Sequence, residues 1–214
     1  MDETPAKKRS RINLQKPIFH ILLIIILGLL AYSNTFNVPF QFDDLVYIID
    51  NPVIKDLKYF ANPSETARID FPERSINNFF RTRFIAFLTF ALNYKMHGLN
   101  VTGYHIFNLV IHILNAFLVY GFVMLTLKIK VSVSGVSDSK EKLKLKTATE
   151  HYSLMPLFSA LLFVAHPIQT QAVTYIWQRV TSLATFCYLL SFVLYIKFRM
   201  SSSAISRQPS AISD

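Results

Sequence analysis

The sequence predicts an all-α, polytopic integral membrane protein with about four transmembrane helices and an amphipathic helix in the membrane interface. Three observations support this fold class. Of the 214 residues, 52% are hydrophobic and only 16% are charged, whereas soluble domains carry about 25% charged residues. The mean hydropathy is positive. The apolar residues also gather in long runs separated by polar and basic stretches.

The apolar runs predict spans at about 17–33, 104–127, 154–172 and 181–197, since about 20 apolar residues cross roughly 30 Å of hydrocarbon. The first run follows the basic stretch 1–16, is long for a signal peptide, and has no small-residue cleavage site after it. From Asn77 to His97 apolar residues recur at helical spacing between charged ones, which predicts the interfacial helix. The tail, 200–214, is rich in Ser and Ala and predicts disorder.

The basic residues predict the orientation of the chain. Residues 1–16, the loop 128–151 and the end of the fourth span are all basic and fall on one side of a four-span protein. The positive-inside rule makes that side cytoplasmic. The net charge of +9 is then explained by orientation and by contact with the anionic lipid of the bilayer, and no segment indicates nucleic-acid binding. The first outer loop, 34–103, faces the periplasm of a bacterial inner membrane, or the lumen if the protein belongs to the endoplasmic reticulum of a eukaryote.

Four polar residues share one face of the second predicted span: His105, Asn108, His112 and Asn115. Polar groups facing lipid are costly, so this face should look into the protein interior. The two histidines lie about 10 Å apart along a helix axis, too far to share one metal ion. We therefore expect hydrogen bonds between helices. Further along the chain, Tyr175 and Trp177 are typical of interfacial anchors.

Two adjacent carboxylates, Asp43 and Asp44, follow the first span in the stretch Phe40-Gln41-Phe42-Asp43-Asp44. An aspartate at the outer interface can act as a general base. A second one beside it can hold an acceptor, bind a metal, or raise its neighbour's pKa. In an extended segment the two side chains would point opposite ways, so that only one faces reacting atoms. The alternative is that one of them caps a helix beginning at Leu45.

Several separated motifs then occur in a characteristic order: Asn34-Thr35-Phe36, Phe42-Asp43-Asp44, Asn51-Pro52, Arg83, Leu88 to Tyr94, His97 to Asn100, Gly103-Tyr104-His105, Ala165-His166-Pro167, Gln169 to Val173 and Gln178-Arg179. Over about residues 20–199 this series resembles the N-terminal membrane part of the transmembrane O-mannosyltransferases with tetratricopeptide repeats, in particular their bacterial relatives. These proteins belong to the GT-C class of glycosyltransferases.

The resemblance implies a membrane-embedded enzyme that transfers a sugar, on the outer face, from a polyprenyl-phosphate donor to a protein or glycan acceptor. It implies Asp43 and Asp44 as catalytic residues, with no required cofactor, although a divalent metal at the pair is not excluded. It also implies substrate contacts from Arg83, His166, Gln178 and Arg179. Arginine's planar fork suits phosphate oxygens, while the alternative for Arg83 and Arg179 is contact with lipid headgroups. Phe84 departs from the Pro or Tyr that often follows the matching arginine.

Length separates this chain from such proteins, which continue into further spans and repeats. We find no 34-residue helical repeat, so the sequence predicts a truncated product or an N-terminal fragment. Two other hypotheses stay open. One is a non-catalytic membrane subunit or inactive remnant that keeps the fold. The other is a small transporter using the His/Asn face of the second span, although its halves show no internal symmetry.

Overall fold

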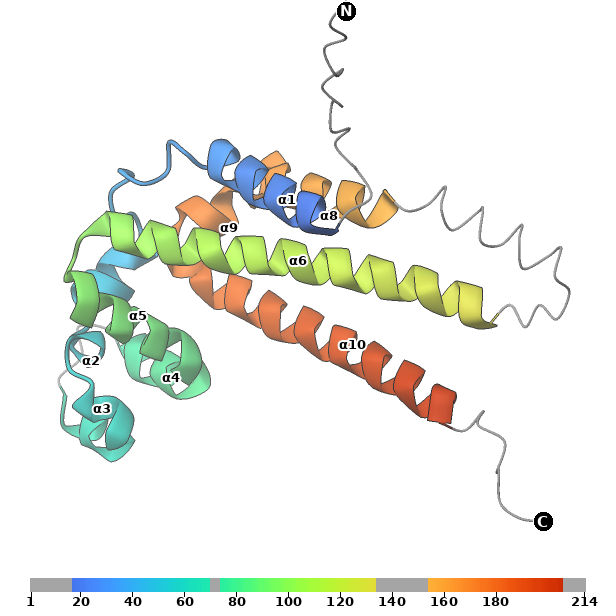
Figure 1. Cartoon of the computed structure of the whole chain (residues 1–214). Coiled ribbons are helices and arrows are strands. Elements are labelled where there is room, and N and C mark those ends of the chain that lie inside the picture. The colour runs from blue at the N-terminus through green and yellow to red at the C-terminus, as the bar shows by residue number, and fades with distance from the viewer. Residues whose placement is uncertain (1–16, 70–73, 134–153, 206–214) are drawn as a thin grey trace, which may run out of the picture.

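The computed structural model describes residues 17–69, 74–133 and 154–205. Every regular element in these ranges is helical, which confirms the all-α class. Four helices lie roughly along one common direction (Figure 1): α1 (Pro17–Ala31), α6 (Val101–Val133), α8 (Met155–Ala165) and α10 (Arg179–Ile205). Helix α6 is the centre of this group, because α10 packs along it and α8 and α1 pack elsewhere on its surface.

Short helices gather at the end of the group where α6 and α10 begin (Figure 1). Those from the first loop are η1 (Leu45–Ile49), α2 (Pro52–Lys55), α3 (Lys58–Ala61), η2 (Pro63–Arg68), α4 (Arg74–Thr82) and α5 (Phe84–His97). The connection from α8 to α10 adds η3 (Pro167–Gln169), α9 (Thr170–Thr174) and η4 (Ile176–Gln178). We call these elements the outer cluster, and both segments singled out by the sequence motifs therefore lie at one end of the molecule.

Two helices of the described residues are long and apolar enough to cross a membrane, within Val101–Ile129 and Ile176–Ser202. Helices α1 and α8 are apolar but have 15 and 11 residues, whereas a span needs about 20. The third predicted span, 154–172, is not one helix, because α8 ends at Ala165 where His166 turns to extended backbone before Pro167. A residue before proline avoids the helical region. Four spans thus remain a prediction.

The predicted single interfacial helix from Asn77 to His97 is wrong, because the structure has two helices that meet at Arg83. The backbone of Arg83 leaves the helical region with φ −125° and ψ 34°, and its guanidinium lies 4.2 Å from the centre of the Phe79 ring. Neither proline nor glycine marks this break in the sequence. Tertiary packing has overridden local helical preference here, and α5 turns Phe87 and Phe90 into the core of the outer cluster.

The polar face of α6 is buried, as predicted, and every one of its four side chains contacts another segment. His105 Nε2 lies 2.8 Å from the carbonyl of Val38, and His112 Nε2 lies 3.2 Å from that of Val164. Asn115 donates to the carbonyl of Ser182, and Asn108 donates to those of Val173 and Ile176. These bonds connect α6 to the first loop, α8, the α8–α10 connection and α10. They confirm the expectation of hydrogen bonds between helices.

Helix α1 approaches its neighbours closely at Gly28. A Cβ atom there would lie 3.1 Å from the Ile113 side chain of α6 and 3.2 Å from the Val164 side chain of α8, so these side chains would have to shift by a few tenths of an ångström to admit it. A polar contact supports the same packing, since His20 Nδ1 lies 3.0 Å from the hydroxyl of Tyr120. Small residues allow such close contact between membrane helices.

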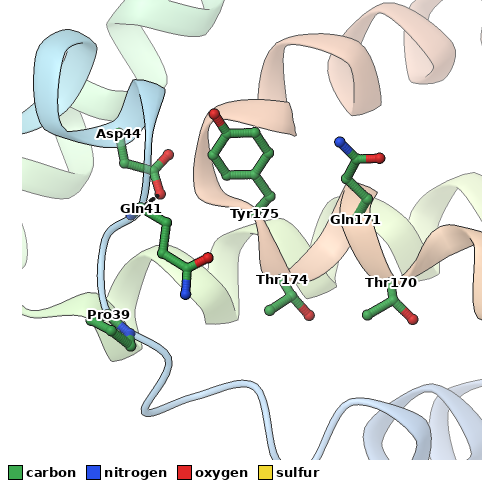
Figure 2. Close-up of a pocket in the computed structure, with 7 residues that line it drawn as sticks. All are labelled: Pro39, Gln41, Asp44, Thr170, Gln171, Thr174 and Tyr175. Carbon is green, nitrogen blue, oxygen red and sulfur yellow. Dashed lines mark hydrogen bonds between the residues drawn. The ribbon is translucent and has the colours of Figure 1, made fainter.

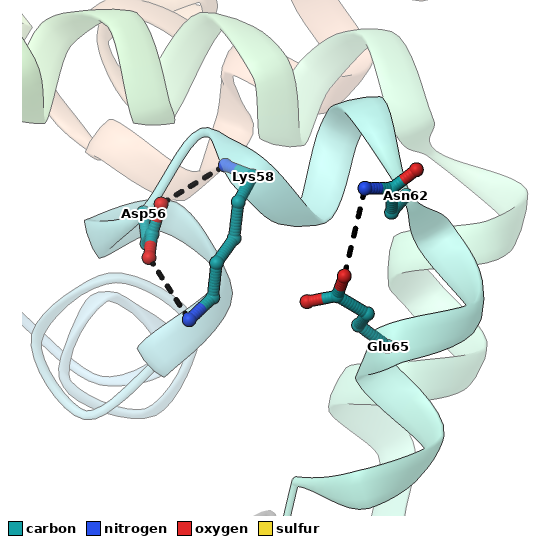
Figure 3. Close-up of polar contacts among 4 residues, drawn as sticks. All are labelled: Asp56, Lys58, Asn62 and Glu65. Carbon is teal, nitrogen blue, oxygen red and sulfur yellow. Dashed lines mark hydrogen bonds and ion pairs between the residues drawn. The ribbon is translucent and has the colours of Figure 1, made fainter.

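The rim of the outer cluster carries short-range polar contacts (Figure 3). Lys58 Nζ pairs with Asp56 at 3.2 Å, and the Lys58 N–H donates to the same carboxylate at 2.9 Å. Asn62 donates to Glu65 at 3.5 Å. These exposed groups close the turns around α3, and exposed ion pairs of this kind contribute little to stability.

Candidate functional site

The acidic pair lies in a tight turn rather than in an extended segment. Asp44 N–H donates to the carbonyl of Gln41 at 2.9 Å, and the Asp44 carboxylate accepts from the Gln41 N–H at 3.0 Å. Phe42 between them has φ +47°, in the left-handed region, and its side chain is 79% exposed. Such a backbone is strained for a phenylalanine. The two adjacent carboxylates face different surroundings. The backbone that carries them is a turn, not the extended segment considered from the sequence.

Asp44 is buried, with 1% of its surface exposed, and it binds main-chain groups of two segments. One carboxylate oxygen accepts from Gln41, and the other accepts from the Trp177 N–H at 2.7 Å. Burial raises the pKa of Asp44 to about 6, against the opposing effect of its main-chain donors. Although Asp44 precedes η1, its side chain makes no capping bond to that helix, so the capping alternative is wrong for this residue. Asp44 instead joins the first loop to the α8–α10 connection.

Asp43 is exposed and lines a cavity of about 330 Å³ together with two other predicted site residues, Arg83 and Gln178. We call it the Arg83 cavity. Its remaining lining residues are Tyr47, Phe79, Trp177, Val180 and Thr181. The Asp43 N–H donates to the Tyr175 hydroxyl at 3.1 Å, which holds this part of the turn against the α8–α10 connection. A carboxylate, a guanidinium and an amide thus share one opening. The guanidinium and the amide supply N–H donors of the kind that stabilise negative charge.

Arg83 is placed to receive an anion. Its guanidinium lies over the rings of Phe79 and Trp177, at 4.2 and 5.9 Å from their centres. The described residues give that guanidinium no hydrogen-bond acceptor and no carboxylate at ion-pair distance. An arginine in this state keeps its five N–H donors for a ligand.

Arg179 does not lie at the cavity, which corrects its assignment as a substrate contact. It is fully buried, at 0% exposure. Its side chain donates to Asn108 Oδ1 at 2.8 Å and to the carbonyls of Tyr104 and Thr89 at 3.1 and 3.3 Å. The rings of Phe90 and Phe107 lie 4.4 and 4.5 Å from the guanidinium carbon. Nε, Nη1 and Nη2 each donate one bond inside the protein, and the side chain has no exposed surface to offer a substrate phosphate or a lipid headgroup. Arg179 therefore fixes α5, α6 and the start of α10 together.

A second cavity, of about 270 Å³, lies between the turn and the α8–α10 connection (Figure 2). Pro39, Gln41 and Asp44 form one wall, and Thr170, Gln171, Thr174 and Tyr175 of the α8–α10 connection form the other. We call it the Asp44 cavity. Asp43 and Asp44 therefore line different cavities. The described residues contain no cluster of three or more His, Cys, Asp or Glu side chains that could hold a metal ion.

His166 lines neither of these two cavities. It is exposed, and its Nδ1 accepts from the Ile168 N–H at 3.2 Å, which starts the η3 turn. Gln178 does line the Arg83 cavity, where its side-chain oxygen accepts from the Thr181 hydroxyl at 2.9 Å.

Tyr175 and Trp177 are the site residues that sequence reasoning missed. Trp177 is only 5% exposed and stacks on Tyr47 and Phe90, with ring centres 4.3 and 5.8 Å apart. It is thus a core residue, and the expectation of an interfacial anchor is wrong for it. Tyr175 touches the backbone of Asp43 and lines the Asp44 cavity. The available signal was that both lie within three positions of Gln178, one of the predicted site residues.

Comparisons with known proteins agree with these motifs. The chain is 29% identical over 186 residues to the Protein O-mannosyl-transferase Tmtc3 of Drosophila melanogaster, which covers 86% of this chain and 19% of that protein. The chain is similar to protein O-mannosyl-transferases over most of its length. It is 28% identical to one from Caenorhabditis elegans over 207 residues, 92% of this chain and 25% of that protein. It is also 28% identical to the human TMTC3 protein over 210 residues, 95% of this chain and 19% of that protein.

The chain thus spans about a fifth to a quarter of the length of these curated relatives. They are animal proteins, so a bacterial source stays a prediction. No protein-family model matches the sequence, and no solved structure matches the chain.

Proposed function

We propose that this chain carries the sugar-transfer site of a membrane-embedded, GT-C-like glycosyltransferase. The donor is a polyprenyl-phosphate-linked sugar, and the acceptor is a hydroxyl group of a protein. The observation that carries the proposal is the Arg83 cavity, where an exposed carboxylate shares one opening with a guanidinium that has no acceptor among the described residues. The names of the relatives, all O-mannosyl-transferases, support mannose as the sugar.

In this proposal the Asp43 carboxylate takes the proton of the acceptor hydroxyl as general base. The hydroxyl oxygen forms a bond to the anomeric carbon of the sugar, and the bond from that carbon to the phosphate oxygen breaks. The electron pair of that bond leaves with the polyprenyl phosphate, whose added negative charge Arg83 stabilises through its N–H groups. Gln178 orients the phosphate or the sugar from the same cavity wall. Asp44 is a positioning residue, because it holds the turn and the Trp177 backbone in place.

The proposal includes a multi-pass protein with the outer cluster on the periplasmic or lumenal face. The two long apolar helices and the two shorter ones running beside them support membrane embedding. A polyprenyl-phosphate donor keeps its chain in the bilayer, and the Arg83 cavity lies where α10 begins. A transporter using the polar face of α6 is less well supported, since these four side chains are bonded to main-chain carbonyls.

The test is sugar transfer in membrane vesicles that contain the chain, with radiolabelled polyprenyl-phosphate mannose and detection of label in protein. Asp43→Asn should lower transfer about a hundredfold or more, because general-base catalysis contributes at least that factor. Asp50→Asn is the matched control, since Asp50 is an exposed aspartate nearby that lines neither cavity. Unchanged transfer by the Asp43 variant, or no transfer above vesicles lacking the chain, would contradict the proposal.

A further inference from the structure

The Asp44 cavity differs in chemistry from the Arg83 cavity. Its walls contain two side-chain amides, two threonine hydroxyls, one tyrosine and one carboxylate, and neither lysine, arginine nor histidine is among its lining residues. A phosphate would therefore meet the Asp44 carboxylate with no compensating cation, which is unfavourable for binding. A ligand of this cavity should be uncharged.

Free hydrogen-bonding groups line this cavity on both walls. The amides of Gln41 and Gln171 and the hydroxyl of Thr170 have no hydrogen-bond partner among the described residues. Figure 2 shows the Gln41 side chain extending from one wall toward Thr174 of the other. An amide both donates and accepts hydrogen bonds, whereas a carboxylate only accepts them. These free amide and hydroxyl groups match a molecule with several hydroxyl groups, because a hydroxyl group can both donate and accept hydrogen bonds.

The size and the surfaces of the cavity also match a small ring. Its volume of about 270 Å³ lies just below the roughly 300 Å³ at which sites for drug-sized ligands begin. The Tyr175 ring contributes an apolar surface beside the polar groups, and the exposed Phe42 ring packs edge-on against it, with centres 6.4 Å apart. A pyranose has hydroxyl edges and an apolar face of C–H groups, so it can use both kinds of surface.

We propose that the Asp44 cavity is a separate binding site for an uncharged sugar ring, contacted by Gln41, Gln171 and Thr170. Tyr175 separates this site from the Arg83 cavity, because its hydroxyl binds Asp43 on one side while the residue lines the Asp44 cavity on the other. The inference rests on the proposed function only in assigning phosphate to the Arg83 cavity. A glycan acceptor or the product sugar would then occupy a site that recognises hydroxyl groups and excludes phosphate.

The test measures two ligands on the purified chain in a polyoxyethylene detergent, which has neither sugar nor phosphate in its headgroup. Trp177 is the single tryptophan of the chain. Its side chain lines the Arg83 cavity, and its main-chain N–H donates to Asp44, which lines the other cavity. Its fluorescence is followed during titration with methyl α-mannoside and, separately, with inorganic phosphate. Saturation-transfer NMR detects the same ligands independently of the fluorophore.

Gln171→Leu and Gln41→Leu should each weaken methyl α-mannoside binding about tenfold, by removing hydrogen bonds, and leave phosphate binding unchanged. Arg83→Met should weaken phosphate binding and leave methyl α-mannoside binding unchanged. Gln169→Leu, the same change two residues away and outside the lining, should alter neither. If Gln171→Leu fails to fold by circular dichroism, Thr170→Val at an exposed position replaces it.

The proposal is overturned if wild type binds no methyl α-mannoside by either method, or if sugar binding survives the Gln171 and Gln41 changes. It is also overturned if Arg83→Met weakens sugar binding as much as Gln171→Leu does. Failure of phosphate to bind would count against the proposed role of Arg83 instead. The two ligands therefore separate failure of this inference from failure of the proposed function.

Discussion

Two neighbouring regions of this protein each contain one aspartate and one arginine. In one region the charged groups are buried and hydrogen-bonded, and in the other they are accessible to a ligand. In the buried region, Asp44 accepts bonds from main-chain N–H groups and Arg179 donates to Asn108 and to main-chain carbonyls. In the Arg83 cavity, the Asp43 carboxylate is exposed, and Arg83 lies over aromatic rings with no hydrogen-bond acceptor in the described part of the chain. Residue type therefore does not decide whether a charged side chain is available to a ligand. Availability depends on how many of its hydrogen-bonding groups already have partners within the protein.

Substitution of Arg179 should cause the largest loss of folding stability. Arg179→Met leaves Asn108 and two carbonyls without their donor. Because each buried acceptor left unsatisfied costs about 1–3 kcal/mol, the variant should destabilise the protein by about 3 kcal/mol or more. Arg81→Met is the matched control, because Arg81 is exposed on α4. Thermal unfolding followed by circular dichroism measures both. Equal melting temperatures for the two variants would remove the distinction between buried and available arginines.

A smaller effect is expected from the titration of Asp44. Its folded-state pKa of about 6 lies above the unperturbed value of about 3.9, so the folded protein holds this proton more tightly than the unfolded chain. Stability should therefore fall as pH rises from about 4 to about 6, by up to about 3 kcal/mol, and level off above that window.

Asp44→Asn removes this titration, so the stability difference between wild type and variant should change across the same window and stay constant above it. Thermal unfolding at closely spaced pH values measures the difference. A difference that is the same at pH 4 and pH 7 would show that burial of Asp44 does not set its proton affinity.

The smallest effect on stability is expected at Arg83. Arg83→Met removes a contact with the face of Phe79 and no hydrogen bond, so it should cost about 1 kcal/mol or less. The same thermal unfolding experiment that measures Arg179→Met measures this variant. A loss of stability as large as that of Arg179→Met would show that both arginines support the fold, and would contradict the distinction between them.

The sequence predicts part of this arrangement and misses the rest for identifiable reasons. The helical class and the interior-facing side chains of α6 follow from composition and from spacing along one helix. Asp43, Arg83 and Gln178 were singled out by motif, and they meet in one cavity. The turn that carries Asp43 and Asp44 includes the left-handed backbone of Phe42, and the sequence gives no sign that a phenylalanine adopts it.

Arg179 shows why burial is harder to predict. Its surroundings come from α5 and α6, about 70 to 90 positions earlier in the chain, and they exist only once the outer cluster has packed. The break between α4 and α5 at Arg83 is similar, since no proline or glycine marks it. In contrast, the end of α8 is marked by the pair His166-Pro167, so this interruption of the third predicted span could be foreseen.

In the proposed reaction, the Arg83 cavity binds the phosphate of the sugar donor. The most direct test places a photo-crosslinking amino acid at Thr181, an exposed lining residue of that cavity, or at Ile168, which is 75% exposed and outside it. Polyprenyl-phosphate mannose should crosslink at Thr181 and not at Ile168, and Arg83→Met should lower the yield at Thr181 about tenfold through loss of charged hydrogen bonds. Equal crosslinking at both positions, or a yield at Thr181 that does not depend on Arg83, would contradict the claim.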